Sequence, residues 1–311
     1  MLFRSMAALA VAVLVSSTAS AGAIGSAELT LTDVRFLVLD SGSFRTATAG
    51  FGADAVANGN DFRLRNAGTS AEQEINFDGN YAYQGGSVDI DADGVLSTTG
   101  VGFGPASQFL GDMTPGSEDF IRTEMGFGGS FIDIDGLVGG SLTSPANGRT
   151  FADFNVNTPG MSGDADVTIA NTSIARFLVA EDSVARIAFK ATLDMSLFDD
   201  GNPFGFLTSA SSGLTLSLTG VGPGYGIAAG NPLTAFTRTI TVGPNQSASV
   251  SEFLDFESDD IFLAAGQTYT LTLSQSVGVA VSQIPEPSSL AIFGVMGIAG
   301  LAVGRRKLKK S

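Results

Sequence analysis

The stretch ARIAFKATLDM at residues 185–195 carries an apolar side chain at every second position. Polar side chains such as Lys190 and Asp194 occupy positions in between. A period of two is typical of a β-strand with one buried face and one solvated face. The same alternation occurs at residues 214–218 and, in its longest form, at residues 269–281. These stretches predict strands that each cover one side of a core.

Clusters of turn-forming residues separate the alternating stretches. Glycine, asparagine, aspartate and proline favour the backbone angles of tight turns and interrupt strands. Many strands joined by such turns predict an all-β fold, an antiparallel sandwich of jelly-roll type. The clusters lie at residues 58–60, 78–80, 199–203, 220–226 and 243–245.

The predicted β domain covers residues 22–283, between two end segments of different character. This length suits one large sandwich or two smaller β domains. The tetrapeptide Arg-Phe-Leu-Val occurs at residues 35–38 and again at 176–179, which is compatible with two related halves. The best boundary between such halves is the loop at 141–148, because it contains a proline and an Asn-Gly pair. Both alternatives are open at this point.

The sequence contains no cysteine and no histidine. The first absence excludes disulfides, thiol nucleophiles and cysteine-bound metals. The second excludes Ser-His-Asp catalysis and imidazole ligands for zinc or copper. Tryptophan is also absent, and the four tyrosines leave few aromatic platforms for sugar rings. We therefore expect a non-enzymatic protein without a resident cofactor, in which paired carboxylates are the remaining source of catalysis.

The predicted domain is more acidic than the whole chain. The chain has 16 Lys and Arg against 31 Asp and Glu, a net charge of −15. Six of the basic residues but only one acidic residue, Glu286, lie outside residues 22–283. The domain therefore keeps 10 basic and 30 acidic residues, a charge of about −20. Such a charge argues against nucleic acid as a partner and favours divalent cations or cationic polymers.

The hexapeptide DIDADG contains the most pointed local motif. Asp89, Asp91 and Asp93, followed by Gly94, match the start of a calcium loop in which alternate carboxylates converge on one ion. The twelfth position of such a loop needs a bidentate glutamate, and Gly100 stands there instead. The alternative is the solvent face of a strand that ends in an Asp-Gly turn. Calcium binding by these three aspartates stays a hypothesis beside that structural interpretation.

Three further pairs of carboxylates repeat the alternating or adjacent pattern more weakly. Aspartates that alternate with apolar residues most often form the solvated face of a strand. A glycosidase-type acid–base pair would require two of them to face each other at about 5 to 10 Å. A carboxylate-dependent hydrolase is permitted by the sequence without being indicated. The pairs are Asp133 and Asp135, Asp164 and Asp166, and Asp259 and Asp260.

The N-terminal segment has the pattern of a secretory signal peptide. Arg4 precedes an apolar run at residues 6–15, and small residues follow, with Ala19 and Ala21 in the spacing of a cleavage site. We expect residues 1–21 to form a signal helix that is removed before Gly22. The protein is then exported.

The C-terminal segment at residues 284–311 consists of three consecutive parts. Two prolines flank a glutamate at residues 285–287, an uncharged apolar run follows at residues 290–303, and five Lys and Arg lie within residues 305–310. The prolines disfavour continuation of a strand or helix across them. We expect a transmembrane helix at about residues 289–304, held by the basic cluster on the cytoplasmic side. An ordinary single-pass anchor is the alternative, although roughly 22 Å of helix is short for a ~30 Å hydrocarbon core.

These three parts together resemble the PEP-CTERM sorting signal, a C-terminal tag on exported proteins of many Gram-negative bacteria. The resemblance covers under a tenth of the chain. It implies recognition in the inner membrane by an exosortase, a membrane protease that cuts near the motif and passes the protein to the cell surface or extracellular matrix. The matching residues are Pro285, Glu286, Pro287, the apolar run from Leu290, and the basic end with Arg305 and Arg306.

Three classes of function remain after these observations. The first is a non-enzymatic surface or biofilm-matrix protein that is sorted and cut through its tail. The second is a β-sandwich module that binds a glycan, such as an extracellular polysaccharide, or calcium. The third is the carboxylate hydrolase. Because both end segments concern destination and nothing between them requires chemistry, we expect the first class.

Overall fold

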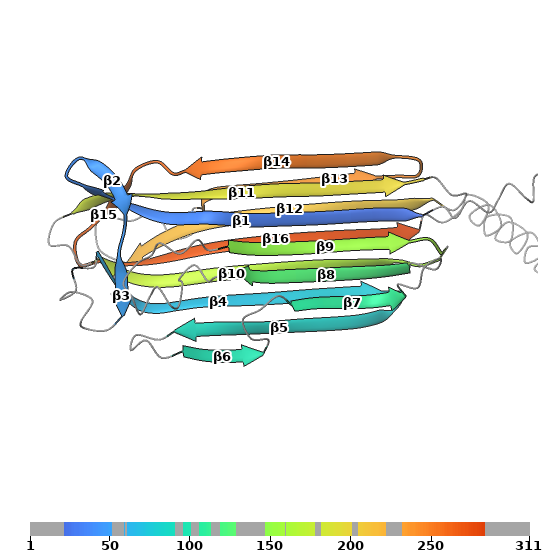
Figure 1. Ribbon diagram of the computed structural model, residues 1–311, viewed down its shortest axis with the longest axis horizontal. Helices are drawn as coiled ribbons and strands as arrows, with labels where there is room; N and C mark the ends of the chain where they lie inside the picture. Colours follow the sequence, from blue (N-terminus) through green and yellow to red (C-terminus); the bar gives the residue numbers. More distant parts are fainter. Residues whose placement is uncertain are drawn as a thin grey trace, which may run out of the picture.

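The computed structural model describes residues 22–51, 59, 61–90, 96–100, 106–112, 119–128, 147–158, 160–177, 182–200, 205–221 and 232–283. In these residues, sixteen strands form two sheets of eight strands each, which pack face to face (Figure 1). All strand pairs are antiparallel except one short parallel pair. The predicted all-β antiparallel architecture is confirmed. The described sandwich has sixteen strands, whereas a jelly roll has eight, so it is larger than the jelly-roll type expected from the sequence.

The first sheet, sheet A, is built around the first strand of the chain. Two short strands extend this sheet at one end: β2 pairs with the last residues of β1, and β15 pairs with the first residues of β11. The order across the sheet is β14 (Ser247–Glu257), β11 (Ser183–Asp199), β1 (Ala23–Asp40), β9 (Asn147–Val156), β8 (Asp119–Gly128) and β7 (Ala106–Asp112), with β2 (Ser43–Thr46) and β15 (Ile261–Leu263) beside them.

The second sheet, sheet B, contains the last strand of the domain at an interior position. The short strand β3 (Ala49–Phe51) attaches to it in parallel with β4. The order is β13 (Pro232–Val242), β12 (Phe206–Val221), β16 (Thr268–Gln283), β10 (Gly163–Phe177), β4 (Phe62–Phe77), β5 (Asn80–Ile90) and β6 (Leu96–Gly100).

Strands from both sides of the segment 141–148 are hydrogen-bonded in each sheet. In sheet A, β1 lies between β11 and β9, and in sheet B, β10 lies between β4 and β16. Both repeated Arg-Phe pairs lie in the second half of their strands: Arg35 and Phe36 are followed by four more residues of β1, and Arg176 and Phe177 end β10. The segments before and after the boundary therefore interleave across the sandwich.

The alternation seen in the sequence determines which side chains enter the core. Along β11, Ile187, Phe189 and Leu193 are buried between the sheets, whereas Thr192 and Asp194 face solvent. Each buried side chain of this size contributes roughly 1.5–3 kcal/mol through removal of apolar surface from water. The core is therefore the layer between the two sheets that the period-two pattern predicts.

One glycine in β1 makes room for an aromatic ring of the core. A Cβ atom on Gly25 would collide with ring carbons of Phe154 on the neighbouring β9 and with a methyl carbon of Leu197 on β11. Phe154 is among the largest fully buried side chains of the described chain. Because the ring lies over the bare backbone, Gly25 is required by close packing rather than by its backbone angles.

Ala23 and Gln283, the first residue of β1 and the last of β16, lie at the same end of the sandwich (Figure 1). The two sheets are joined here by a hydrogen bond of 2.8 Å from the Phe206 backbone N–H to Oδ2 of Asp199. This end, defined by Ala23, Asp199, Phe206 and Gln283, is called the tail-bearing end below. The predicted signal peptide, residues 1–21, and the predicted transmembrane helix, about 289–304, lie outside the described residues. Within the described ranges, we find no helix of the length and apolarity needed to span a lipid bilayer.

Candidate functional site

The residues of the predicted sorting motif follow directly after the described domain. β16 ends at Gln283, two residues before the first proline of the motif. Gln283 pairs with Phe206 of β12, so strand pairing continues to the last described residue. The sorting residues themselves, Pro285, Glu286, Pro287, Arg305 and Arg306, lie outside the described residues.

The calcium hypothesis is only partly covered by the structure. Asp89 lies in β5, where its backbone is opposite Gly68 of β4 and Ser97 of β6. Asp91 and Asp93 lie outside the described residues. In the part of the chain that is described, no group of three acidic side chains has the geometry to hold a metal ion.

Of the other predicted carboxylate pairs, one is held by an arginine. Arg186 contacts Oδ1 of Asp260 at 2.6 Å and Oε1 of Glu257 at 2.6 Å, and the guanidinium also lies 4.2 Å from the centre of the Phe44 ring. The neighbouring Asp259 presents its backbone oxygen to the Ser258 hydroxyl. Asp133 and Asp135 lie outside the described residues. The contacts of Asp260 are those of a surface ion pair rather than of an acid–base dyad.

Asp164 and Asp166 lie on the solvent face of sheet B, beside two glutamates and two tyrosines. In the register of the sheet, Glu74 on β4 lies opposite Asp166 of β10 on one side and Tyr83 of β5 on the other. Two residues further along β4, Asn76 lies in the same way between Asp164 and Tyr81. Glu72 lies one row further along β4, where its Oε2 accepts a long hydrogen bond of 3.5 Å from the Tyr83 hydroxyl. We call this area the tyrosine–carboxylate face, made of Glu72, Glu74, Tyr81, Tyr83, Asp164 and Asp166.

The two tyrosines of this face are strongly exposed. Tyr81 retains 62% of its accessible surface and Tyr83 retains 55%. They are two residues apart on β5 and therefore point to the same side of the sheet. Of the other two tyrosines in the chain, Tyr269 is buried and its hydroxyl accepts a hydrogen bond of 2.6 Å from the Ala264 backbone N–H. Tyr81 and Tyr83 are thus exposed aromatic surface beside a set of carboxylates.

The carboxylates of this face repel one another. Partial burial, followed by the negative charges of Asp164 and Glu74, raises the pKa of Asp166 above its usual value. Partial desolvation and the charge of Glu74 likewise raise the pKa of Tyr81. The Asp166 carboxylate lies directly over Gly278 of β16, where a Cβ atom would collide with it. A concentration of negative charge of this kind favours cationic groups in a ligand.

The sequence contained a signal for this arrangement that the search for chemical motifs missed. Glu72 and Glu74 alternate on one side of the Asp78-Gly79 turn, and Tyr81 and Tyr83 alternate on the other side. Asp78 and Gly79 both have positive φ, at 47° and 76°, so the turn is a tight two-residue connection. Such a turn fixes the register of the hairpin, and the register brings the two alternating pairs together.

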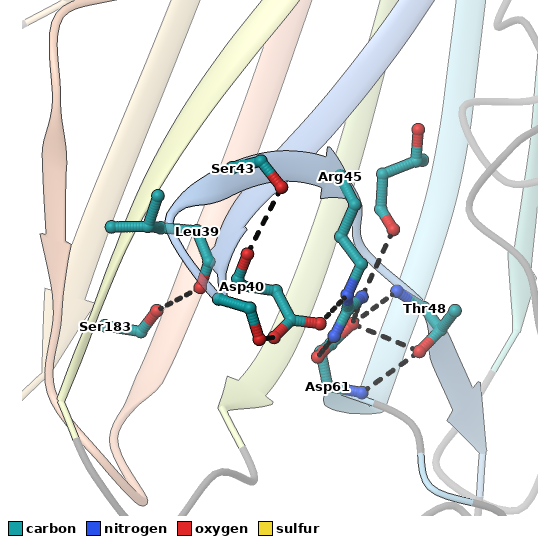
Figure 2. A network of polar contacts seen from close by, with 9 residues as sticks. Leu39, Asp40, Ser43, Arg45, Thr48, Asp61 and Ser183 are labelled. Atoms are coloured by element: carbon teal, nitrogen blue, oxygen red, sulfur yellow. Dashed lines mark hydrogen bonds and ion pairs between the residues drawn. The ribbon is translucent and has the colours of Figure 1, made fainter.

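A second polar cluster lies at the opposite end of the sandwich, next to β2 (Figure 2). Asp61 is buried and accepts hydrogen bonds of 2.8 Å from both terminal nitrogens of Arg45, and also from the backbone N–H and hydroxyl of Thr48. Nε of Arg45 donates a further bond of 2.8 Å to Oδ2 of Asp40. Burial raises the pKa of Asp61, but its bonds to Arg45 and Thr48 outweigh burial and lower it overall. Both carboxylate oxygens of Asp61 therefore accept hydrogen bonds, and the cluster links β2 to the start of β4.

The core of sheet B contains a buried glutamine without partners. Gln275 on β16 is 2% exposed, and among the described residues neither its side-chain oxygen nor its nitrogen has a hydrogen-bond partner. A second buried glutamine, Gln73 on β4, donates a bond of 2.6 Å to Gln84 and accepts one of 3.0 Å from the Thr123 hydroxyl. The two residues have the same side chain and similar burial, and differ in whether the amide is satisfied.

Comparison with known proteins finds a match in the C-terminal tail of the chain. Residues 283–307 match the family model of the PEP-CTERM protein-sorting motif, so the predicted resemblance is confirmed at the predicted position. This motif implies export and membrane-associated sorting by an exosortase. No curated protein matches the chain. No solved structure matches it. The chain therefore combines an all-β sandwich with a PEP-CTERM protein-sorting motif at residues 283–307.

Proposed function

We propose that this chain is a non-enzymatic surface or extracellular-matrix protein that an exosortase cuts from its membrane tail. One observation carries the proposal: the sorting motif begins at residue 283, where β16 ends. A cut near Pro285–Pro287 would leave every strand of the sandwich complete. The acidic domain would then leave the membrane folded, and the basic cluster with Arg305 and Arg306 would stay behind with the apolar run.

Before the cut, the chain is an intermediate anchored in the inner membrane. The uncharged run at residues 290–303 supplies the anchor, and the positive charges after it hold that end in the cytoplasm. After the cut, a charge of about −20 keeps the domain soluble and available to other matrix components. The exosortase is thus a transient partner, and the matrix is the final location.

Deletion of the cognate exosortase tests this proposal. We expect full-length chain to accumulate in the membrane fraction, and the shorter form to disappear from the surface and medium. A triple variant with Pro285→Ala, Glu286→Ala and Pro287→Ala in the normal strain should behave in the same way, because it keeps the anchor but loses the motif. A chain without residues 290–311 should fractionate as untethered periplasmic protein. Normal surface delivery of the triple variant would contradict the proposal.

A second candidate function, binding of a matrix polysaccharide, is favoured by the tyrosine–carboxylate face. Exposed aromatic rings provide flat apolar surface against which a sugar ring can pack. The carboxylates beside them would complement protonated amino groups of a partly deacetylated amino-sugar polymer. Because the acidic side chains lie along the two neighbouring strands β4 and β10 and, within the described residues, do not converge on one point, an extended cationic chain suits them better than a single metal ion.

Co-sedimentation with such a polymer tests this second candidate. Tyr83→Ala should weaken retention, and high salt should weaken it further because the carboxylate contacts are screened. Phe253→Ala, at an aromatic residue on sheet A that is 65% exposed against 55% for Tyr83, is the matched control and should change nothing. Equal retention of both variants would contradict a role for this face.

A further inference from the structure

The exposed apolar side chains of the described chain are concentrated at the tail-bearing end. Nine large hydrophobic residues are exposed in the described residues, and six of them lie within three positions of a strand terminus at this end. Two others, Leu39 and Phe262, lie at the opposite end, and Phe253 lies near the middle of β14. We call the six residues the apolar girdle: Ile24, Tyr81, Tyr83, Phe109, Phe198 and Leu207.

The girdle surrounds the point at which the chain leaves the sandwich. Ile24 and Phe198 are direct register partners on the solvent face of sheet A, 50% and 49% exposed. Leu207 is 47% exposed and is the register partner of Ser282, one residue before Gln283. Exposed apolar residues on both sheets therefore flank the start of the tail.

The length of the tail limits how far this end can lie from the lipid. Six residues separate Gln283 from Leu290, where the uncharged run begins. Even a fully extended chain spans at most about 3.6 Å per residue, so Gln283 lies within about 25 Å of the start of the run. A tether this short gives an effective concentration in the millimolar range, at which weak apolar contacts are sufficient for docking.

We propose that the apolar girdle rests on the outer surface of the lipid bilayer while the tail is in place, which holds the sandwich upright over its cleavage site. This inference rests on the proposed function, since it requires the run at residues 290–303 to be inserted. Aromatic and aliphatic side chains at the headgroup level are typical of protein surfaces that contact a membrane interface. Docking would also present the segment after Gln283 at a constant height to a membrane protease.

The charges at this end specify the lipid. Four exposed carboxylates lie close to the girdle, at Asp78, Asp112, Asp164 and Asp200. Arg122, the register partner of Phe109, is bound by Asp153 at 2.8 Å and by Glu124 at 3.3 Å. The docked surface is therefore acidic around an apolar contact. It should prefer zwitterionic lipid and be repelled by anionic lipid, the reverse of a polybasic membrane-binding site.

The absence of tryptophan from the sequence gives a direct test, because each introduced tryptophan is the only one in the chain. The full chain is inserted into vesicles of phosphatidylcholine brominated near the glycerol end of the acyl chains. We expect the fluorescence of Ile24→Trp and Leu207→Trp to be quenched relative to plain vesicles. Leu39→Trp, at the opposite end, is the matched control and should be unaffected. Replacing part of the lipid with phosphatidylglycerol should reduce the quenching at both girdle positions.

A fourth reporter, Phe293→Trp in the apolar run, separates the two proposals. Quenching of Phe293→Trp without quenching of the girdle reporters would support insertion of the apolar run and would overturn the docked orientation. If Phe293→Trp is not quenched, the anchor fails, and the orientation that depends on it fails too. If the fluorescence of the girdle tryptophans changes only when the exosortase is reconstituted in the same vesicles, the girdle contacts a protein, and docking on lipid is overturned.

Discussion

Arg45 holds Asp61 through two parallel hydrogen bonds of 2.8 Å at the end of the sandwich farthest from the tail. The carboxylate is 5% exposed, whereas the guanidinium is partly open to water and also binds Asp40. Bidentate geometry of this kind makes a charge pair both stronger and more specific than a single contact. The pair connects β2 to the residue immediately before β4.

Replacing the buried partner of this pair should destabilise the domain. Asp61→Asn removes the charge and leaves Arg45 and Thr48 incompletely bonded. We expect a loss of about 2 kcal/mol in the free energy of unfolding, less than for a fully buried pair because Arg45 is half-exposed. Glu252→Gln, which breaks the exposed pair with Arg238, is the control and should lower the free energy of unfolding clearly less, because solvent screens exposed ion pairs. Urea unfolding of the two variants measures the difference, and equal losses would contradict the structural role of Asp61.

The same pair predicts a dependence of stability on pH. The pKa of Asp61 is lower in the folded protein than the ordinary value of 3.8. A lowered pKa stabilises the fold above the unfolded value, and this contribution is lost as the pH falls through the folded value. The difference in the free energy of unfolding between the parent chain and Asp61→Asn should therefore be largest at pH 7 and should shrink below pH 3.8. A gap that widens on acidification would contradict the assignment.

The two buried glutamines should respond in opposite directions to the same substitution. Gln275→Met removes an amide that has no partner, and we expect a gain of about 1–2 kcal/mol in the free energy of unfolding. Gln73→Met removes the hydrogen-bond partner of the Thr123 hydroxyl and of the Gln84 side chain, and we expect a loss of about 2 kcal/mol in the free energy of unfolding. Thermal or urea unfolding distinguishes the two outcomes. Destabilisation by Gln275→Met comparable to that of Gln73→Met would show that Gln275 is satisfied in solution.

Crowding of carboxylates on sheet B should make the domain more stable in mild acid. The raised pKa of Asp166 means that its charged form is disfavoured in the folded state, so stability falls as the pH rises from 3.8 through the raised value. Asp166→Asn should therefore raise Tm at pH 7, and the gain should diminish at high salt and vanish below pH 3.8. Asp200→Asn, at an exposed aspartate outside this face, should have a smaller effect. A lower Tm for Asp166→Asn at pH 7 would show that Asp166 has a favourable partner.

Much of the fold followed from the sequence because one physical pattern is repeated along it. The alternation at residues 185–195 gave the buried and solvated faces of β11, and the Asp78-Gly79 turn is where the hairpin of β4 and β5 closes. The order of the strands did not follow, since it depends on pairings such as β1 with β11, more than a hundred residues apart. Local periodicity carries no information about such pairings.

The candidate surfaces were less predictable than the strands. Asp164 and Asp166 were recognised as a solvated pair, but their proximity to Glu74 and Tyr83 depends on the pairing of β10 with β4. The ion pair of Asp61 has no sequence signature, because Asp61 is sixteen residues after Arg45 and follows no motif that would bring the two together. The tail was predictable because the sorting motif is contiguous, and its meaning depends on neighbouring residues alone.

Mass spectrometry of the exported protein tests the central claim most directly. The account predicts a mature C-terminus near Pro285–Pro287, with the apolar run and the basic cluster of residues 305–310 absent and the sandwich intact through Gln283. An exported protein that still carries Ser311 would contradict exosortase cleavage and with it the proposed route to the cell surface.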